Sequence, residues 1–256
     1  GINAAVEHIA KFGLPEDQIP RNLSMALGSA SFSPLQMAQA YAVFANDGFQ
    51  VKPYYIAKIE DGRGDVEFEA EPKVACASTS NCPALQNTGS KRDASRLAER
   101  VIDASNAWLV GDMMRDVVKR GTGRRAMTLG RNDLSGKTGT TNDQIDAWFV
   151  GFNADLVGIS WVGFDKLTPM GHSETGGHAA LPMWIDFMRV ALDGTPEAIP
   201  PRPGDLVAVS IDPDSGQRAL EGGGMTEYFR PENVPSVEEA RRSGKNAPSN
   251  EVEQLF

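Results

Sequence analysis

The chain has very little of what builds metal sites and disulfide frameworks. Its 256 residues include two cysteines and three histidines. Cys76 and Cys82 lie in one short segment with no second pair and no nearby histidine, so we expect no zinc site. In an oxidising compartment the pair can close a small disulfide loop, and otherwise it leaves two surface thiols. The spacing alone does not decide between these two states, and no motif indicates a cofactor.

Long apolar runs and an excess of positive charge are missing too. No run approaches the roughly 18 apolar residues needed to span a bilayer. No signal peptide is visible and the first residue is Gly1 rather than Met, so we expect a fragment or a processed product. The formal net charge of -9 makes the chain a poor candidate for binding nucleic acid. Its 41% hydrophobic content is enough for one large domain or two small ones.

Two helices are predicted in the first 50 residues. Apolar residues at helical spacing predict a helix over residues 2–10. A second helix begins after Ser33, which can cap it, while Pro34 suits the first helical position and Gln36 can close a capping box. This helix is expected to stop near residues 46–48, where the sequence is Asn-Asp-Gly.

A hairpin, a polar segment and a long helix are predicted next. Residues 54–59 and 66–68 are expected to be strands, with the turn signal Asp-Gly-Arg-Gly at 61–64 between them. Residues 70–100 are polar, hold both cysteines and are expected to form an exposed excursion. A long helix should then run from its cap, Asp103, to about residue 120. Its buried stripe is expected to comprise Val110, Met113, Met114 and Val117.

Three strands are predicted in the second half of the chain, over residues 134–140, 147–152 and 156–164. A tight turn at 153–155 joins the last two, so they should pair antiparallel. Residues 181–192 are expected to form a helix that packs on the sheet. These elements predict an α/β (α+β) fold with an antiparallel sheet flanked by helices. One more strand is expected over residues 206–211, followed by a turn.

The first of these three strands carries the most informative motif, the five residues Lys137, Thr138, Gly139, Thr140 and Thr141. A cation and hydroxyls on one extended segment suit the binding of a substrate carboxylate. On an edge strand, a peptide can add alongside the backbone, and the N–H of Thr140 can then donate to the substrate carbonyl as an oxyanion-hole donor. Gly139 leaves room for the close approach. The alternative is an ordinary strand with an exposed lysine.

Several segments resemble the C-terminal part of the transpeptidase domain of class A penicillin-binding proteins, of the bifunctional 1A type. The Lys-Thr-Gly triplet is the third of three motifs that such proteins share. The resemblance runs in order over about residues 1–230, which is far more specific than the triplet. It is carried by residues 22–30, 40–48, 114–118, 120–123, 136–142, 146–149, 182–184 and 211–216.

The resemblance implies a penicillin-binding protein/serine β-lactamase-like fold that is incomplete in this chain, and a peptidoglycan D,D-transpeptidase. In the family, a serine attacks the D-Ala-D-Ala end of a stem peptide, and an amine from a neighbouring strand then resolves the acyl-enzyme. β-Lactams acylate the same serine. The implied catalytic residues are Thr140 and Lys137, and the implied substrate-binding residues are 137–141. The implied location is the periplasmic face of the bacterial inner membrane, in a parent that also holds a peptidoglycan glycosyltransferase.

The other two family motifs, Ser-x-x-Lys and Ser-x-Asn, do not occur in these 256 residues. Because the family places both motifs upstream, we expect the nucleophilic serine on an N-terminal fragment of the same protein, and we expect this chain alone to be inactive. Without that partner, apolar and strand-edge surface should remain uncovered. Peptidoglycan stem peptides, and β-lactams bound covalently through the missing serine, are the other expected partners.

The expected layout is a transpeptidase part over residues 1–200, a strand extension over 201–230 and a disordered tail over 231–256. Two other functions stay open. One is a hydrolase of the same fold, either a serine β-lactamase or a D,D-carboxypeptidase. The other is a non-enzymatic penicillin-sensing module.

Lesser candidates have ordinary structural explanations. Asp143 and Asp146 form a possible carboxylate pair, but turn capping and strand-end hydrogen bonding are favoured. His172 and His178 are expected to be surface-loop residues rather than metal ligands. Glu174 and Thr175 lie in the same loop, which the family places near the mouth of the cleft, and either can contact substrate there. Three tryptophans are expected in the core rather than stacked on glycan, namely Trp148, Trp161 and Trp184.

Overall fold

The computed structural model describes residues 1–76, 82, 94–219 and 224–236. The chain divides into two compact units, Gly1–Pro201 and Arg202–Phe256. The first unit is built on a three-stranded antiparallel sheet of β5 (Ser135–Thr140), β6 (Asp146–Phe152) and β7 (Val157–Gly163). The order is β5-β6-β7, so β5 is an edge strand of the described sheet. The predicted strands and their antiparallel pairing are therefore confirmed, as is the fold class.

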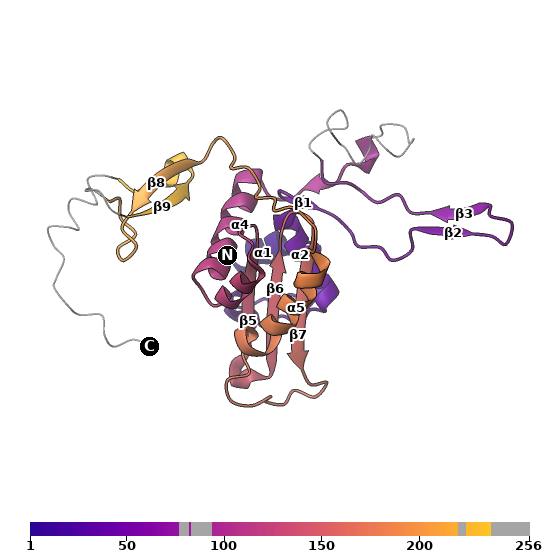
Figure 1. Cartoon of the computed structure of the whole chain (residues 1–256), viewed down its shortest axis with the longest axis horizontal. Helices are drawn as coiled ribbons and strands as arrows, with labels where there is room; N and C mark the ends of the chain where they lie inside the picture. Colours follow the sequence, from indigo (N-terminus) through magenta and orange to yellow (C-terminus); the bar gives the residue numbers. More distant parts are fainter. Residues whose placement is uncertain (77–81, 83–93, 220–223, 237–256) are drawn as a thin grey trace. The chain divides into compact units, whose positions relative to one another are not determined.

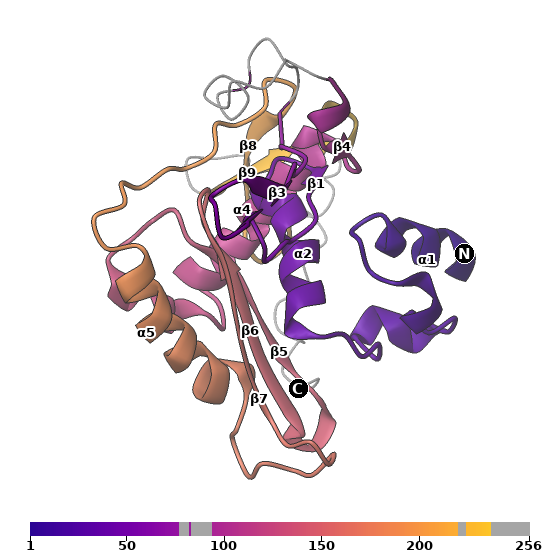
Figure 2. The same ribbon diagram turned by 90° about the vertical axis from the view of Figure 1, so that its right-hand side faces the viewer.

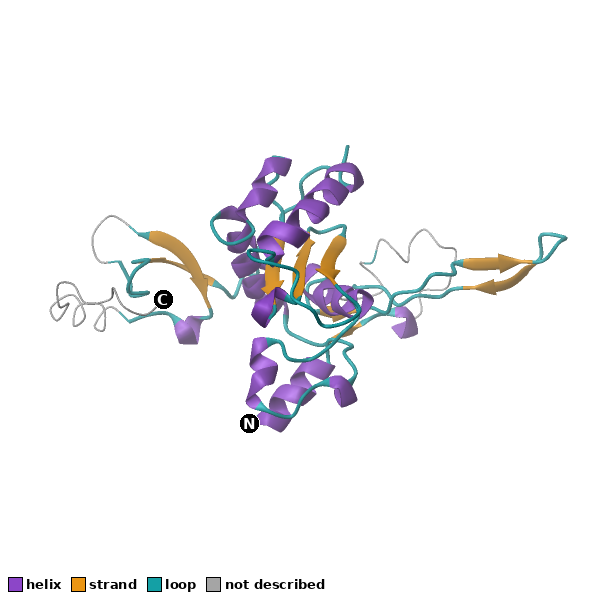
Figure 3. Ribbon diagram, turned by 90° about the horizontal axis from the view of Figure 1, so that it is seen from below, coloured by secondary structure: helices purple, strands orange, loops and turns teal. Residues whose placement is uncertain are grey.

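Helices lie on both faces of this sheet (Figures 1 and 3). Helix α5 (Leu181–Ala191) covers one face, and helix α2 (Pro34–Ala45) packs against β6 and β7 on the other, as Figure 2 shows. Helix α4 (Ala104–Lys119) contacts β5. The layering follows from the sequence, because β6 has little polar character and needs cover on both sides.

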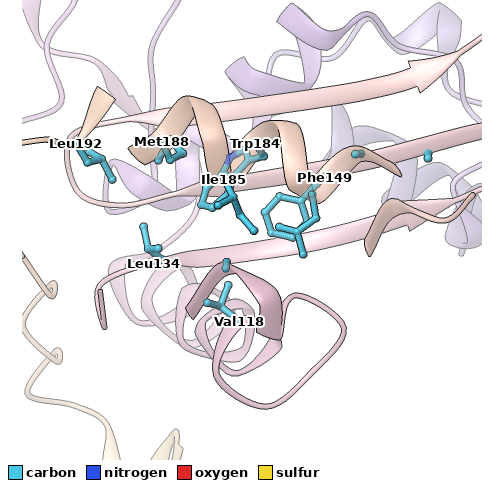
Figure 4. Packing of buried hydrophobic residues seen from close by; sticks show 11 residues of the cluster. Val118, Leu134, Phe149, Trp184, Ile185, Met188 and Leu192 are labelled. Carbon is cyan, nitrogen blue, oxygen red and sulfur yellow. The ribbon is translucent and has the colours of Figure 1, made fainter. Parts of the chain in front are cut away.

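The main core lies between the sheet and α5 (Figure 4). Phe149 of β6 and Trp184 of α5 are fully buried and meet edge to face, with ring centroids 4.9 Å apart. Two glycines make room for this contact. A Cβ on Gly151 would lie 2.4 Å from the Trp184 ring, and one on Gly136 would lie 2.7 Å from the Phe149 ring. The close approach of α5 to the sheet therefore depends on glycine in β5 and β6.

The predicted local signals for helices are confirmed. Helix α1 spans Ile2–Ala10. In α2 the Ser33 hydroxyl accepts from the Gln36 N–H, and the Gln36 side chain accepts from the Ser33 N–H, which completes the capping box. The Asp103 carboxylate accepts from the Asn106 N–H and so caps α4. Each of these signals is local in sequence, so the surrounding fold does not alter it.

The expected apolar stripe of α4 is partly wrong. Met114 is buried, but Met113 is 65% exposed. The buried face also includes Ala107 and Val118, together with the small or polar residues Ser105, Gly111 and Arg115. The face is mixed because α4 packs against β5 and against α2, so it lies between two neighbours rather than on one apolar surface.

Two short pairings involve the segments around the cysteines. Strands β2 (Lys58–Glu60) and β3 (Val66–Glu69) form the predicted hairpin, although the first strand begins at Lys58 rather than at residue 54. Strands β1 (Phe49–Gln50) and β4 (Glu99–Arg100) pair antiparallel, which the sequence did not predict. Cys76 and Cys82 form a disulfide, which decides between the two alternatives for this pair. Most of the polar excursion lies outside the described residues.

The second unit contains the predicted strand β8 (Val207–Ile211) and its turn, in which the Asp212 carboxylate accepts from the N–H groups of Asp214 and Ser215. Its partner β9 (Met225–Phe229) was not predicted. Residues 231–233 form a short 3₁₀ helix. Residues 237–256, most of the expected tail, lie outside the described part.

Apolar side chains are left uncovered in the first unit. Leu23 and Leu27, on the 3₁₀ helix Leu23–Leu27, are 80% and 91% exposed. This confirms the expectation of uncovered apolar surface. Among the described helices, none combines the length and the apolar character required to cross a bilayer.

Candidate substrate-binding edge

The candidate site is the outer edge of β5, from Lys137 to Thr140. The N–H of Thr141, the next residue, donates to the carbonyl of Asp146, the first residue of β6 (3.1 Å). In an antiparallel pair, consecutive residues alternate between facing the partner strand and facing away from it. The N–H and C=O groups of Thr138 and Thr140 therefore point away from β6, toward the open edge. This orientation is the one that binding a peptide by strand addition requires.

Thr140 is held by the loop that precedes α5. Its Oγ1 accepts a hydrogen bond from the N–H of Gly176 (3.0 Å). Because a hydroxyl has one donor and two acceptor positions, its own O–H stays available to donate to an anion. Gly176 approaches very closely, since an added Cβ would lie 2.3 Å from the Trp148 carbonyl oxygen and 2.6 Å from the Gly139 carbonyl oxygen. Only glycine allows this contact.

Thr138 is held by the turn that follows α4. Its Oγ1 lies 2.7 Å from Oγ1 of Thr122, and either hydroxyl can be the donor. The same turn is anchored in the core, because Gly123 is buried and an added Cβ there would lie 3.3 Å from the Phe149 ring. Thr138 and Thr140 thus share one face of β5, and a different segment positions each hydroxyl.

Lys137 and Gly139 lie on the other face, as the strand periodicity predicts. Lys137 is exposed, and its Nζ donates to the Thr138 carbonyl (2.6 Å), which points toward the open edge. The ammonium group therefore lies beside the edge atoms. At Gly139 an added Cβ would lie 3.2 Å from Cβ of Trp148, so the missing side chain accommodates β6 as well as leaving space for a ligand.

Thr141 is placed differently from the other four residues of the motif. Its Oγ1 accepts from the N–H of Asp146 (2.8 Å), so its hydroxyl and its N–H both close the turn between β5 and β6. Asp146 also accepts from Nε1 of Trp161 (2.8 Å). The predicted strand-end role of Asp146 is confirmed. Asp143 lies within this turn at a φ of 58°.

The segment at residues 171–178 lies against β5 through Gly176 and Gly177, which begin the π-helical turn Gly176–Ala180. His178 therefore lies in this turn and not in the surface loop expected for it. His178 is exposed, and its Nδ1 lies 3.1 Å from Oγ1 of Thr175. His172 and Glu174 are exposed loop residues, as expected for the histidine. Within the described residues, no three His, Cys, Asp or Glu side chains are grouped to hold a metal ion.

The start of β5 is anchored by a buried ion pair. The Asp133 carboxylate is bound by the Arg131 guanidinium (2.7 and 2.9 Å), by Nδ2 of Asn153 (3.3 Å) and by the N–H of Ala198 (3.2 Å). Burial alone raises the pKa of Asp133, but these hydrogen bonds outweigh it and hold the pKa below its usual range. Arg131 also donates to the Thr195 carbonyl (2.7 Å), so one side chain links β5 to the segment after α5.

The three tryptophans differ in burial. Trp184 is 1% exposed, as expected. Trp161 is 37% exposed, so its assignment to the core is wrong. It packs on Trp148 of the neighbouring strand, with ring centroids 6.1 Å apart, on the sheet face opposite α5. Strand alternation places both rings on that face, and α2 leaves Trp161 partly uncovered.

Two residues of the edge were missed from the sequence. Neither Thr122 nor Gly176 was assigned to the site from the sequence. They contact residues 16 and 36 positions away. The only signal was that both segments are rich in glycine, which is typical of places where backbones approach closely.

The chain matches the family described as "Penicillin binding protein transpeptidase domain" over residues 9–182. It is 41% identical to Penicillin-binding protein 1A of Pseudomonas aeruginosa over 92% of this chain, and 44% identical to Penicillin-binding protein 1A of Neisseria lactamica over 77% of it. The chain spans 32% and 22% of the length of these two relatives.

Two solved structures are also similar. A crystal structure of Penicillin-Binding Protein 1A from Haemophilus influenzae has a TM-score of 0.80 and 37% identity, covering 92% of this chain and 37% of its own length. The PonA1 protein from Mycobacterium tuberculosis, solved in complex with penicillin V, has a TM-score of 0.56 and 26% identity, covering 79% of this chain and 51% of its own.

Proposed function

The chain belongs to the penicillin-binding protein transpeptidase domain family, and from this premise we propose that it forms one wall of the active site of a peptidoglycan D,D-transpeptidase. The observation that carries the proposal is the open edge of β5, where the N–H and C=O groups of Thr138 and Thr140 point away from the sheet. This edge is available to a peptide, and the hydroxyls and the ammonium group beside it suit a carboxylate.

Each group has a distinct role in this proposal. The N–H of Thr140 donates to the carbonyl oxygen of the reacting D-Ala, where negative charge develops in the transition state. The hydroxyls of Thr138 and Thr140 donate to the terminal carboxylate, and Lys137 adds positive potential beside it. Thr141 is better assigned to the turn than to the substrate, because its hydroxyl and N–H are both used by Asp146.

The nucleophile comes from outside these 256 residues, which contain no Ser-x-x-Lys. We assign it to a serine on an N-terminal segment of the same protein. The serine displaces the terminal D-Ala and forms an acyl-enzyme, and an amine of a neighbouring stem peptide then displaces the serine to form the crosslink. β-Lactams acylate the same serine. The proposed parent protein also carries a peptidoglycan glycosyltransferase and acts at the periplasmic face of the inner membrane.

Labelling with a fluorescent penicillin tests this function. The full-length protein that carries this chain should be labelled at equimolar stoichiometry, and the isolated 256-residue chain should stay unlabelled. The variant Thr140→Val should lower the rate of acylation by roughly 10- to 100-fold, because it removes a hydrogen bond to a charged group. Thr141→Val is the matched control and should label at nearly the unmodified rate.

Other outcomes would contradict the proposal. Labelling of the isolated chain would show that the nucleophile lies within it. Rapid turnover of the β-lactam by the full-length protein would indicate a hydrolase, and stable acylation with no crosslinking of stem peptides would indicate a sensor.

A further inference from the structure

A cluster of positive charge lies beside the open edge of β5. Residues 119–125, called here the basic turn, contain four basic residues and no acidic one, in a chain whose net charge is -9. The cluster follows directly on α4, which ends at Lys119. Such a local reversal of sign attracts anions to one place on an otherwise acidic molecule.

Three of the four cations have no carboxylate partner among the described residues, and two of these three lie beyond the end of α4. Arg120 pairs with Asp116 one helical turn earlier. Arg124 and Arg125 are both exposed, and within the part of the chain that the structure describes neither forms an ion pair. Both begin the 3₁₀ helix Arg124–Leu129, in which the next residue, Ala126, is fully buried. The buried alanine fixes the backbone that carries the two guanidinium groups.

The basic turn is also attached to the candidate site. Its Thr122 lies 2.7 Å, oxygen to oxygen, from the Thr138 hydroxyl. An added Cβ on Gly177 would lie 3.2 Å from the Thr122 carbonyl oxygen, so the turn also packs against the loop that holds Thr140. Arg124 and Arg125 follow Thr122 by two and three positions, so the turn that carries them contacts both segments that position the hydroxyls of β5.

We propose that Arg124 and Arg125 form a second anion subsite, which binds a side-chain carboxylate of the peptide that lies along β5. This carboxylate is distinct from the terminal one bound by Thr138 and Thr140. A guanidinium group suits it, because its planar fork matches the two oxygens of a carboxylate. The inference rests on the proposed function for the identity of the peptide. The subsite binds acidic stem peptides more tightly than amidated ones.

A pair of labelled peptides tests the subsite in the full-length protein. The peptides end in the same free carboxylate and differ at one internal side chain, which is a carboxylate in one and a carboxamide in the other. Fluorescence anisotropy at low ionic strength should show the carboxylate peptide binding roughly 1.5- to fivefold more tightly, the range for exposed ion pairs. The difference should shrink as salt is raised.

The double variant Arg124→Gln/Arg125→Gln should abolish this difference in affinity, and it should bind the carboxamide peptide as tightly as the unmodified protein does. Arg124→Lys/Arg125→Lys should keep part of it, because the charge remains and the fork is lost. The control is Arg189→Gln, which removes one positive charge from an exposed position on α5. It should leave the affinity for both peptides unchanged.

Three results would overturn the subsite. In the first, the double variant binds both peptides equally more weakly. In the second, it keeps the same difference in affinity between them. In the third, it binds both peptides as before and loses only its binding to vesicles of anionic phospholipid. Penicillin labelling distinguishes failure of the subsite from failure of the proposed function. The double variant should label like the unmodified protein. If the unmodified protein is not labelled, the proposed function fails, while the anisotropy difference still decides the subsite.

Discussion

The two ends of strand β5 are built in opposite ways. At its start, Ser135 is 3% exposed and its hydroxyl donates to the Gly111 carbonyl of α4 (2.9 Å), next to the buried carboxylate of Asp133. At its end, Lys137 and Thr140 are exposed, and the outward backbone groups have no partner strand among the described residues. One strand thus has a buried half that sets its position and an open half that is free for a ligand.

The comparison teaches how a binding edge can be both open and rigid. An edge strand held only by its own ladder would be free to shift or to pair with another chain. Here the buried ion pair holds one end, while Thr122 and Gly176 hold the hydroxyls at the other. Stability should therefore depend mostly on the buried end, and ligand geometry on the open end.

The largest expected loss of stability comes from a substitution at the buried end of β5. Asp133→Ala leaves the Arg131 guanidinium buried without its partner, and breaking such a pair costs roughly 3–5 kcal/mol. Urea unfolding of the chain, followed by circular dichroism, measures the change in the free energy of unfolding. The control is Asp186→Ala, which removes an exposed partner of Arg189 and should cost at most about 1 kcal/mol. Equal effects of the two substitutions would show that the buried end does not anchor the sheet.

A smaller effect is expected from the glycine that contacts the open end. Gly176→Ala places a methyl group 2.3 Å from the Trp148 carbonyl oxygen, and overpacking of this kind costs roughly 1–3 kcal/mol. It should also displace the hydrogen bond to Thr140. Gly111→Ala is the control, since no atom outside its own helix lies within 4 Å of the added Cβ. It should be neutral or stabilise α4 by up to about 1 kcal/mol, because alanine favours a helix interior. The same unfolding measurement compares the two variants, and a neutral Gly176→Ala would mean that the loop can move aside.

Acidification should lower the free energy of unfolding by protonating Asp133 at the buried end. The loss should be smaller than that caused by Asp133→Ala, because protonation leaves the side chain in place. The folded-state pKa of Asp133 is lowered, so its contribution is fully present above the unfolded-state pKa of about 4. The contribution is lost as the pH falls below that value and through the folded-state pKa. Unfolding free energies measured between pH 6 and pH 3, a range that brackets the unfolded-state value, should fall more steeply for the unmodified chain than for Asp133→Asn. Parallel pH profiles would assign the acid sensitivity to other carboxylates.

Much of the structure around the two ends of β5 could be predicted from the sequence, because the signals involved lie within a few residues of one another. The capping box at Ser33 and the cap at Asp103 depend on residues three positions apart, and both formed as predicted. The strands around the Lys-Thr-Gly motif were foreseen because tight turns and apolar alternation fix them within a few residues. The outward direction of Thr140 then follows from strand periodicity alone.

What could not be foreseen depends on contacts between distant segments. The two-residue strands β1 and β4 pair across about fifty positions of sequence, and strands so short carry no periodicity. Met113 has the right spacing for the core and is exposed, because the neighbours of α4 cover the side that holds Gly111, Met114 and Val118. The contacts of Thr122 and Gly176 with the motif arise only when α4, β5 and the loop before α5 come together.

The smallest expected effect concerns the hydroxyl pair at the open end. Thr122 and Thr138 exchange one exposed hydrogen bond, so Thr122→Val or Thr138→Val should lower the free energy of unfolding by about 0.5–1 kcal/mol. A double-mutant cycle isolates the pair, and a coupling of about 0.5 kcal/mol or more between the two substitutions is expected. In the full-length protein, Thr122→Val should slow acylation by penicillin although Thr122 itself contacts no substrate, because it frees Thr138 to rotate away from the edge. Thr122→Ser, which keeps the hydroxyl, should restore the rate. If valine and serine label equally fast, Thr138 is held by the strand alone, and the open end needs no support from the turn.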